Sequence, residues 1–343
     1  MFVPTPDELV KFCGYSHHKI ALGTKEENEA TYRFFERLER GKIENPREST
    51  FKKHLNTLFE TLRKRLKSDA TKGLLNVNLD APESKTFWEI CIDEAERGYK
   101  IHRSEIPFPL FRHETLRLEA LDNHLDRKLE KIDRIEQVRL KAINFLECTG
   151  LYNLKSMQKL RSELEMAESK EKIKFIRISV AKIITLYILI CLEIDQVGIC
   201  ERKSFLRNVF PVFNGDHLER PMTRFLVRFK ETKGIKTDKK FCDLIAPKFA
   251  DYSDPHSIQR EYRKWKNDGV IPNFRRFKQL YIGLGYPENE NTIDLVYFYM
   301  NLKLLDWIFQ DSTNTPDSRL IADMIISEND TFFELALFAK SQI

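Results

Sequence analysis

The chain has 343 residues and a mass of 40.7 kDa, which is long enough for more than one domain at about 100–200 residues each. Hydrophobic residues make up 42% of it, and 25 Phe supply more apolar bulk than disordered chains carry. With 12 Gly and 13 Pro, collagen-like and linker-like architectures are excluded. The net charge of +5 is small, so the distribution of charge says more than its sum.

The cysteines and the apolar runs indicate a cytoplasmic protein. None of the six Cys belongs to a C-x-x-C motif or stands at zinc-finger spacing from a His, so we expect reduced thiols. The N-terminal residues lack the basic and then apolar pattern of a signal peptide. The longest apolar run, residues 183–192, is half as long as a membrane span, which needs about 20 residues. We therefore expect a buried helix there and no membrane association.

Helical periodicity dominates residues 1–210. Thr24 and Glu27 form a capping-box pattern ahead of an apolar stripe, and a second stripe follows residues 49–50. Between residues 116 and 146, apolar residues recur at helical steps, which predicts one long helix in a bundle or, alternatively, a short coiled-coil seam. Alternation at residues 74–79 indicates one strand, which cannot form a sheet alone. The predicted fold class is therefore all-α.

Charge divides the rest of the chain. A break with the turn signal Asn214-Gly215 falls at residues 211–221. Residues 220–287 then hold 16 Lys or Arg against 7 Asp or Glu, a net charge of +9, whereas residues 288–343 have a net charge of −7. This pattern is typical of a polyanion-binding unit, although a solvated basic face would give the same count.

We therefore expect three parts: a helical N-terminal region (1–210), a basic module (216–287) and an acidic helical C-terminal segment (288–343). In the last part, residues 295–309 are apolar around most of the helical turn. A helix of that kind needs cover on several sides. We expect it to be buried against the N-terminal helices or against a second subunit.

Four short helices are predicted in the basic module, starting near Pro221, Thr237, Pro255 and Pro272-Asn273. In the third helix, apolar residues at steps of four and three define an inner face, so the opposite face points outward. Arg and Gln read guanine and adenine edges in a major groove, and Lys suits phosphate. The residues expected to contact DNA are Ser257, Gln259, Arg260, Arg263, Lys264, Lys266, Arg275 and Arg276.

Residues 221–287, one fifth of the chain, resemble a helix-turn-helix domain of the lambda-repressor/Cro type. The pattern that carries the resemblance is Trp265, Gly269, Pro272, Phe277, Leu280 and Leu284-Gly285. The resemblance implies a positioning helix over 237–246 and a recognition helix over 255–266, with Ser257, Gln259, Arg260 and Arg263 facing the bases.

Three features depart from that family pattern. The turn between the two helices has about eight residues, where three or four are usual. The turn that follows Trp265 is one residue longer than usual, and the positioning helix lacks the Gln common at its start. A longer turn could tilt the third helix away from the usual groove geometry.

A second set of residues suggests RNA cleavage. The pairs Arg47 and His54, Arg97 and His102, and Arg117 and His124 have the Arg-x4–6-His spacing, which resembles the active-site motif of HEPN-type ribonucleases. The His would transfer a proton and the Arg would bind phosphate. Chance spacing predicts nearly as many pairs, so the alternative is partly exposed helix residues. Of the three pairs, Arg117 and His124 fit best.

No nucleotide, metal or nucleophile motif accompanies these pairs. His17 and His18 stand near Cys13 without a second ligand cluster, so we expect neither a metal nor another cofactor. The leading hypothesis is a non-enzymatic, double-stranded-DNA-binding transcription regulator. A homodimer is compatible with it, because readers of palindromic sites are two-fold dimers. The alternatives are an RNA-cleaving effector of a toxin or phage-defence system and a helical protein-interaction scaffold.

Overall fold

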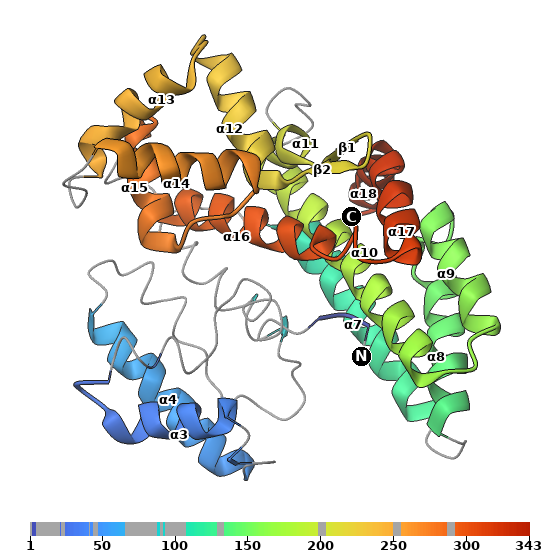
Figure 1. The fold of residues 1–343 in the computed structure, drawn as a ribbon. Helices are drawn as coiled ribbons and strands as arrows, with labels where there is room; N and C mark the ends of the chain where they lie inside the picture. Colours follow the sequence, from blue (N-terminus) through green and yellow to red (C-terminus); the bar gives the residue numbers. More distant parts are fainter. Residues whose placement is uncertain are drawn as a thin grey trace. The chain divides into compact units, whose positions relative to one another are not determined.

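The computed structural model describes residues 2–4, 21, 25–40, 42–43, 47–65, 88–89, 92, 108–128, 134–197, 204–249, 255–286 and 292–343. These residues form α-helices and one small hairpin (Figure 1), which confirms the all-α prediction. The strand-like run at residues 74–79 lies outside the described residues.

The chain divides into two compact units, Val3–His124 and Leu125–Gln342. In the first unit, α3 (Glu29–Glu39) packs against α4 (Glu48–Arg65). Their shared core consists of Ala21, Phe34, Phe35 and Leu58. The division into 1–210, 216–287 and 288–343 rests on composition and stays a prediction.

The capping-box pattern at Thr24 and Glu27 gave the wrong start for α3. The helix begins at Glu29, and its N-cap is Asn28, whose side chain accepts a hydrogen bond from the Thr31 amide at 3.1 Å. Asn is at least as good an N-cap as Thr, so Asn28, four residues after Thr24, caps α3.

The second unit begins at Leu125, in the last turn of α7, and contains the helices that follow α7. The helices in order are α7 (Pro109–Lys128), α8 (Arg134–Cys148), α9 (Lys155–Glu165), α10 (Lys170–Val197), α11 (Phe205–Val209), α12 (Pro221–Thr232), α13 (Asp238–Ile245), the 3-10 turn η2 (Ala246–Lys248), α14 (Pro255–Asn267), α15 (Phe274–Gly283), α16 (Thr292–Phe309), α17 (Pro316–Ser327) and α18 (Asn329–Lys340). The stretch at 116–146 is thus described as α7 and α8, with residues 129–133 outside the described part of the chain.

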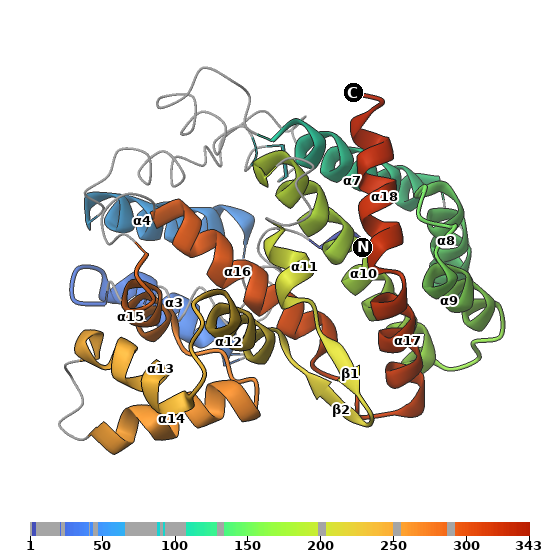
Figure 2. The ribbon, with the colours of Figure 1, turned by 90° about the horizontal axis from the view of Figure 1, so that it is seen from above.

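Helix α10 is the centre of the second unit. It packs against α8, α9, α16 and α18, and Figure 2 shows it among the helices of this unit. Its apolar run at 183–192 is almost wholly buried, as predicted. Among the described helices, it is the one long and apolar enough to cross a membrane, although 72% of its most apolar window is buried inside the protein.

Helix α16 joins the basic module to the α10 core. It contacts α10 and α11 as well as α12 and α15, so its apolar run at 295–309 is covered from several sides. This agrees with the prediction of burial against N-terminal helices, because α10 and α11 precede the basic module. The cover comes from the same chain.

The break at residues 211–221 contains a hairpin that the sequence did not predict. Strands β1 (Val212–Asn214) and β2 (His217–Glu219) pair antiparallel, and Gly215 follows β1 with φ +62°. The predicted turn at Asn214-Gly215 is therefore a hairpin turn, where Gly tolerates a positive φ. Arg319 of α17 donates to the Gly215 carbonyl at 2.9 Å and lies over the Phe213 ring.

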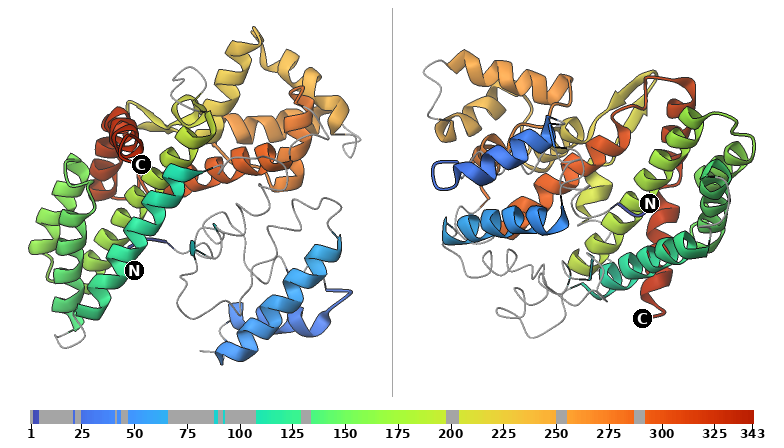
Figure 3. Two further views of the ribbon diagram at one scale, coloured as in Figure 1. Left: turned by 180° about the vertical axis from the view of Figure 1, so that it is seen from behind. Right: turned by 90° about the horizontal axis from the view of Figure 1, so that it is seen from below.

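The four helices predicted in the basic module are present as α12, α13, α14 and α15 (Figure 3). Pro221 is the first residue of α12, and the Thr237 side chain caps α13 by accepting from the Lys240 amide at 3.2 Å. The last helix begins at Phe274, directly after Pro272-Asn273 as predicted, and the Asn273 side chain caps it by accepting from the Arg276 amide at 3.0 Å.

Gly269, between α14 and α15, lies against Arg220. Its φ is +64°, and a Cβ there would stand 2.5 Å from the Arg220 Cβ. The Arg220 guanidinium is itself held by Asp306 of α16, with Nε–Oδ1 at 2.8 Å. The turn after α14 therefore requires Gly for two reasons, its backbone conformation and the close approach of a fixed side chain.

We expect Gly269→Ala to lower the free energy of unfolding by about 3 kcal/mol, the sum of left-handed strain and local overpacking. Gly234→Ala is the matched control, since Gly234 has φ +65° and a Cβ there would meet nothing within 4 Å. It should cost about 1 kcal/mol from strain alone. Urea unfolding measures both, and equal losses would contradict the close approach.

Candidate nucleic-acid interface

The rotation of α14 about its own axis is fixed by three buried side chains. Ile258, Tyr262 and Trp265 are 4%, 2% and 1% exposed. The Tyr262 ring lies 4.9 Å from Phe241 of α13, and Trp265 lies 5.9 Å from Phe249. The inner face predicted from the sequence is thus confirmed, and the opposite face of α14 points away from the module.

The outward face of α14 is cationic. Arg260, Arg263 and Lys264 are exposed. Lys264 pairs with Glu261 at 3.2 Å but keeps 58% of its side chain exposed, so this surface pair leaves its charge accessible. Gln259 and Ser257 are half-buried on the same helix. Its charged groups are therefore placed where a polyanion can reach them.

Helix α15 contributes in two different ways. Arg275 is exposed and remains a candidate for a contact with phosphate. Arg276 is half-buried, with its guanidinium 5.8 Å from the Phe249 ring and a hydrogen bond to Gln279 at 3.0 Å. These contacts give Arg276 a packing role beside any contact with nucleic acid.

One carboxylate connects α12, α13 and α14. Asp238, in the first turn of α13, accepts from Lys230 of α12 at 2.5 Å. It also accepts from Lys266 at 2.8 Å and from the Tyr262 hydroxyl at 3.0 Å, both on α14. Burial alone would raise the pKa of Asp238, but these three hydrogen bonds outweigh it and hold the pKa at about 2.

Lys266 therefore has a structural task. The sequence groups it with the residues that contact DNA, and in the structure its ammonium lies 2.8 Å from the Asp238 carboxylate while 35% of its side chain stays exposed. Two exposed lysines at the start of α13, Lys239 and Lys240, were not among the residues singled out from the sequence. Lys239 and Lys240 were counted in the net charge of residues 220–287, but a net charge does not show which lysines are paired with a carboxylate.

The connection between α13 and α14 is longer than in a tight helix-turn-helix. Helix α13 ends at Ile245, η2 follows, and α14 begins at Pro255. Phe249, just after η2, is 1% exposed and packs on Trp265, which ties the described part of the connection to α14. Residues 250–254 lie outside the described residues. The departure in turn length expected from the sequence is present.

The Arg and His pairs are only partly within the described residues. The Arg117 guanidinium donates twice to Glu114, at 3.0 and 2.7 Å, and Glu114 is 3% exposed. The side chain of His124 lies outside the described residues, as do Arg97 and His102. The pairing of Arg117 with His124 therefore lies outside the described residues.

His54 packs between α3 and α4. Its Nδ1 lies 3.2 Å from the Thr31 hydroxyl, and its ring stacks on Phe34 at 4.1 Å. Burial, and then the charge of Lys53, lower its pKa. This is the environment of a packed helix residue.

In the described part of the chain, no three His, Cys, Asp or Glu residues are grouped so that they could hold a metal ion. His17, His18 and Cys13 lie outside that part. No family model, no curated protein and no solved structure matches this chain.

The Asp238 cluster predicts an acid-sensitive module. The folded-state pKa of about 2 lies below the unfolded value of about 3.9, so the stabilisation is complete above about pH 5 and is lost as the pH falls toward 2. Because the carboxylate is 46% exposed, we expect about 1 kcal/mol after solvent screening. Asp238→Asn should lose that amount at pH 6 in urea unfolding, and its deficit should shrink at pH 3.

Asp243→Asn is the control, because Asp243 is an exposed carboxylate on the same helix. It should leave both the stability at pH 6 and its pH dependence unchanged. A deficit in Asp238→Asn that stays constant from pH 6 to pH 3 would show that the carboxylate charge is not what stabilises the module.

Proposed function

We propose that the protein binds double-stranded DNA, without catalysis and as a regulator, through the outward face of α14. One observation carries the proposal. Burial of Tyr262 and Trp265 turns Arg260, Arg263 and Lys264 outward along one helix. Basic side chains exposed together on one outer helix face are what a polyanionic partner requires.

The dimensions and chemistry of this face suit a major groove. An α-helix is about 10–12 Å wide with its side chains, and the major groove of B-DNA is about 12 Å wide. Arg260 and Arg263 carry planar forks that bind guanine edges or phosphate, and Lys264 suits phosphate. Gln259, half-buried beside them, has the amide that pairs with adenine.

Long-range electrostatics favour the same partner. Residues 220–287 hold a net charge of +9, which raises the local concentration of a polyanion near the module. Each phosphate neutralised by Lys or Arg releases a counterion, so binding driven in this way falls steeply with salt. Lys239 and Lys240, exposed on α13, add to that field.

The two alternatives differ in what they require. RNA cleavage through Arg117 and His124 gains nothing from the described contacts, because the Arg117 guanidinium is engaged by Glu114. A protein-interaction scaffold would bind its partner without the salt dependence that phosphate contacts impose. Transcription regulation, a role in phage defence, a homodimer and a cytoplasmic location stay predictions.

We expect the double variant Arg260→Ala/Arg263→Ala to bind duplex DNA at least about tenfold more weakly, which is the loss of one or more strong contacts. If both residues contact phosphate, the log–log salt slope should become shallower by about two. Fluorescence anisotropy with a random duplex at two salt concentrations measures both quantities.

Arg228→Ala is the matched control. Arg228 is an exposed Arg of the same module, but its Nε donates to Asn208 of α11 at 3.2 Å, so it serves another surface. Its loss should change affinity little. A wild-type salt slope near zero, or equal effects of the control and the double variant, would contradict the proposal.

A further inference from the structure

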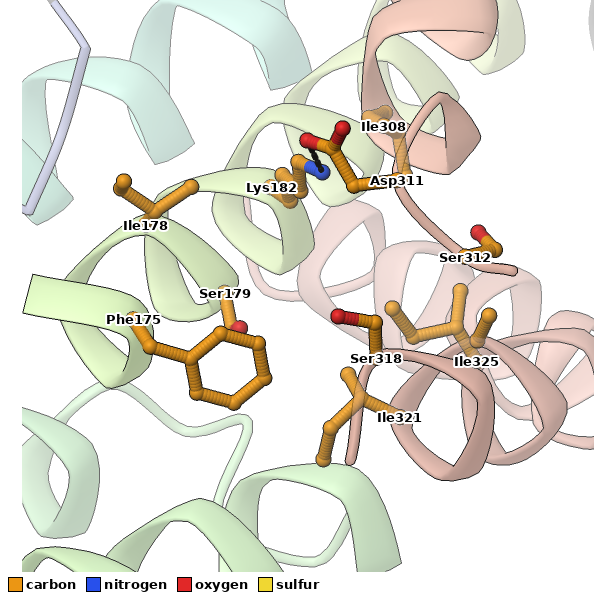
Figure 4. Close-up of a pocket in the computed structure, with 11 residues that line it drawn as sticks. Phe175, Ile178, Ser179, Lys182, Ile308, Asp311, Ser312, Ser318, Ile321 and Ile325 are labelled. Atoms are coloured by element: carbon orange, nitrogen blue, oxygen red, sulfur yellow. Dashed lines mark ion pairs between the residues drawn. The ribbon is translucent and has the colours of Figure 1, made fainter. Parts of the chain in front are cut away.

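A small cavity lies between α10, the end of α16 and the start of α17, all in the second unit (Figure 4). Its volume is about 120 Å³. Its apolar wall is formed by Phe175, Ile178, Ile308, Ile321, Ala322 and Ile325. A closed, dry cavity of about 150 Å³ accepts benzene. This cavity is smaller but reaches the surface at Ile178, which is 36% exposed, so a single ring is the largest apolar body that fits.

One positively charged side chain, that of Lys182, also lines the cavity. Lys182 of α10 reaches it with 12% of its side chain exposed, and its ammonium lies 5.7 Å from the Trp307 ring. In the described part of the chain it makes one ion pair, with Asp311 at 3.7 Å, which is longer than a hydrogen bond. Burial lowers the pKa of Lys182 although Asp311 acts to raise it. Its charge is therefore incompletely compensated.

Asp311 is not confined to this pair. Its side chain is 50% exposed, and its carboxylate accepts from Asn314 at 3.1 Å and from Gln310 at 3.4 Å. The carboxylate can leave Lys182 without being buried alone, because water and these amides remain its partners. Separating Lys182 from Asp311 therefore costs little free energy, so another anion can take the place of Asp311.

A second polar group faces the same space. Ser179 precedes Lys182 by three residues on α10, so the two side chains share one face of the helix. Ser179 is 5% exposed and lines the cavity beside the ammonium's helix turn (Figure 4). Two more hydroxyls line the cavity, but Ser312 donates to the Phe309 carbonyl at 2.7 Å and Ser318 shares a hydrogen bond with Thr315 at 2.8 Å. The Lys182 ammonium and the rotatable Ser179 hydroxyl can both donate to a carboxylate.

We propose that this cavity binds a small monocarboxylate with a benzene-sized apolar body, whose carboxylate replaces Asp311 against Lys182. The apolar wall takes the body, and the ammonium and the Ser179 hydroxyl take the carboxylate. A phosphate or a dicarboxylate would bring more negative charge than one ammonium compensates. The inference does not depend on DNA binding, and it is tested without DNA.

Isothermal titration calorimetry of the full chain at pH 7 tests it with benzoate as the carboxylate and benzamide as its neutral match. We expect benzoate to bind with a Kd on the order of 100 µM, an ordinary affinity per atom for so small a ligand. Benzamide should bind at least about tenfold more weakly, because it cannot pair with the ammonium.

Two variants separate a ligand site from a packing contact. Lys182→Met keeps the length and the apolar stem, and it should weaken benzoate binding at least about tenfold while leaving benzamide unchanged. Lys174→Met is its control, an exposed lysine on the same helix, and should bind as the wild type does.

Asp311→Asn removes the competing carboxylate, so benzoate should bind about three- to tenfold more tightly. A structural ion pair gives no reason for such a gain, and this variant keeps the test valid if Lys182→Met fails to fold. No binding of benzoate to the wild type, equal binding of benzamide, or weaker binding to Asp311→Asn would each overturn the proposal.

Discussion

The orientation of α14 depends on the shared carboxylate of Asp238. Three donors from two other helices converge on it, and two of them are ammonium groups, Lys230 and Lys266, that would repel each other without it. The carboxylate belongs to the first turn of α13, where the helix dipole also favours negative charge. Apolar burial of Trp265 fixes which face of α14 is inside, and Asp238 fixes where α14 lies along α12 and α13. Burial thus sets the direction of the outward arginines, and the Asp238 contacts tie their helix to α12 and α13.

Local signals explain why the module was predictable from its sequence. Pro221, Thr237 and Gly269 mark helix starts and stops through backbone geometry alone, so their meaning does not depend on distant residues. The stripe of Ile258, Tyr262 and Trp265 has helical spacing, which gave the buried face correctly. The pairing of Lys266 with Asp238, which lies 28 residues away in the chain, has no local sequence signal. No periodicity shows which lysine on a polar face has found a carboxylate.

Elsewhere, tertiary contacts decided what the sequence left open. The hairpin at β1 and β2 has three residues in each strand, too few for an alternation signal, and Arg319 of α17 holds its turn. Asn28 displaced Thr24 as the cap of α3, because several residues near a helix start can serve and packing selects one. The cavity at Lys182 had no sequence signal at all. Its walls come from α10, α16 and α17, and a lysine beside an apolar stretch looks the same whether its ammonium reaches water or not.

Two aspartates, Asp306 at the end of α16 and Asp311 in the turn after it, form ion pairs of different strength. Asp306 is 20% exposed and meets the Arg220 guanidinium at 2.5 and 2.8 Å, and although burial raises its pKa, Arg220 acts against that rise. Breaking this pair would leave a buried carboxylate without its partner, which is costly. Asp311 is half exposed and stands 3.7 Å from Lys182, so water compensates it when the pair opens. Separating Arg220 from Asp306 is therefore costly, and this pair helps to hold the basic module against α16. Separating Lys182 from Asp311 costs less, so the Lys182 ammonium is the one that can pair with a ligand.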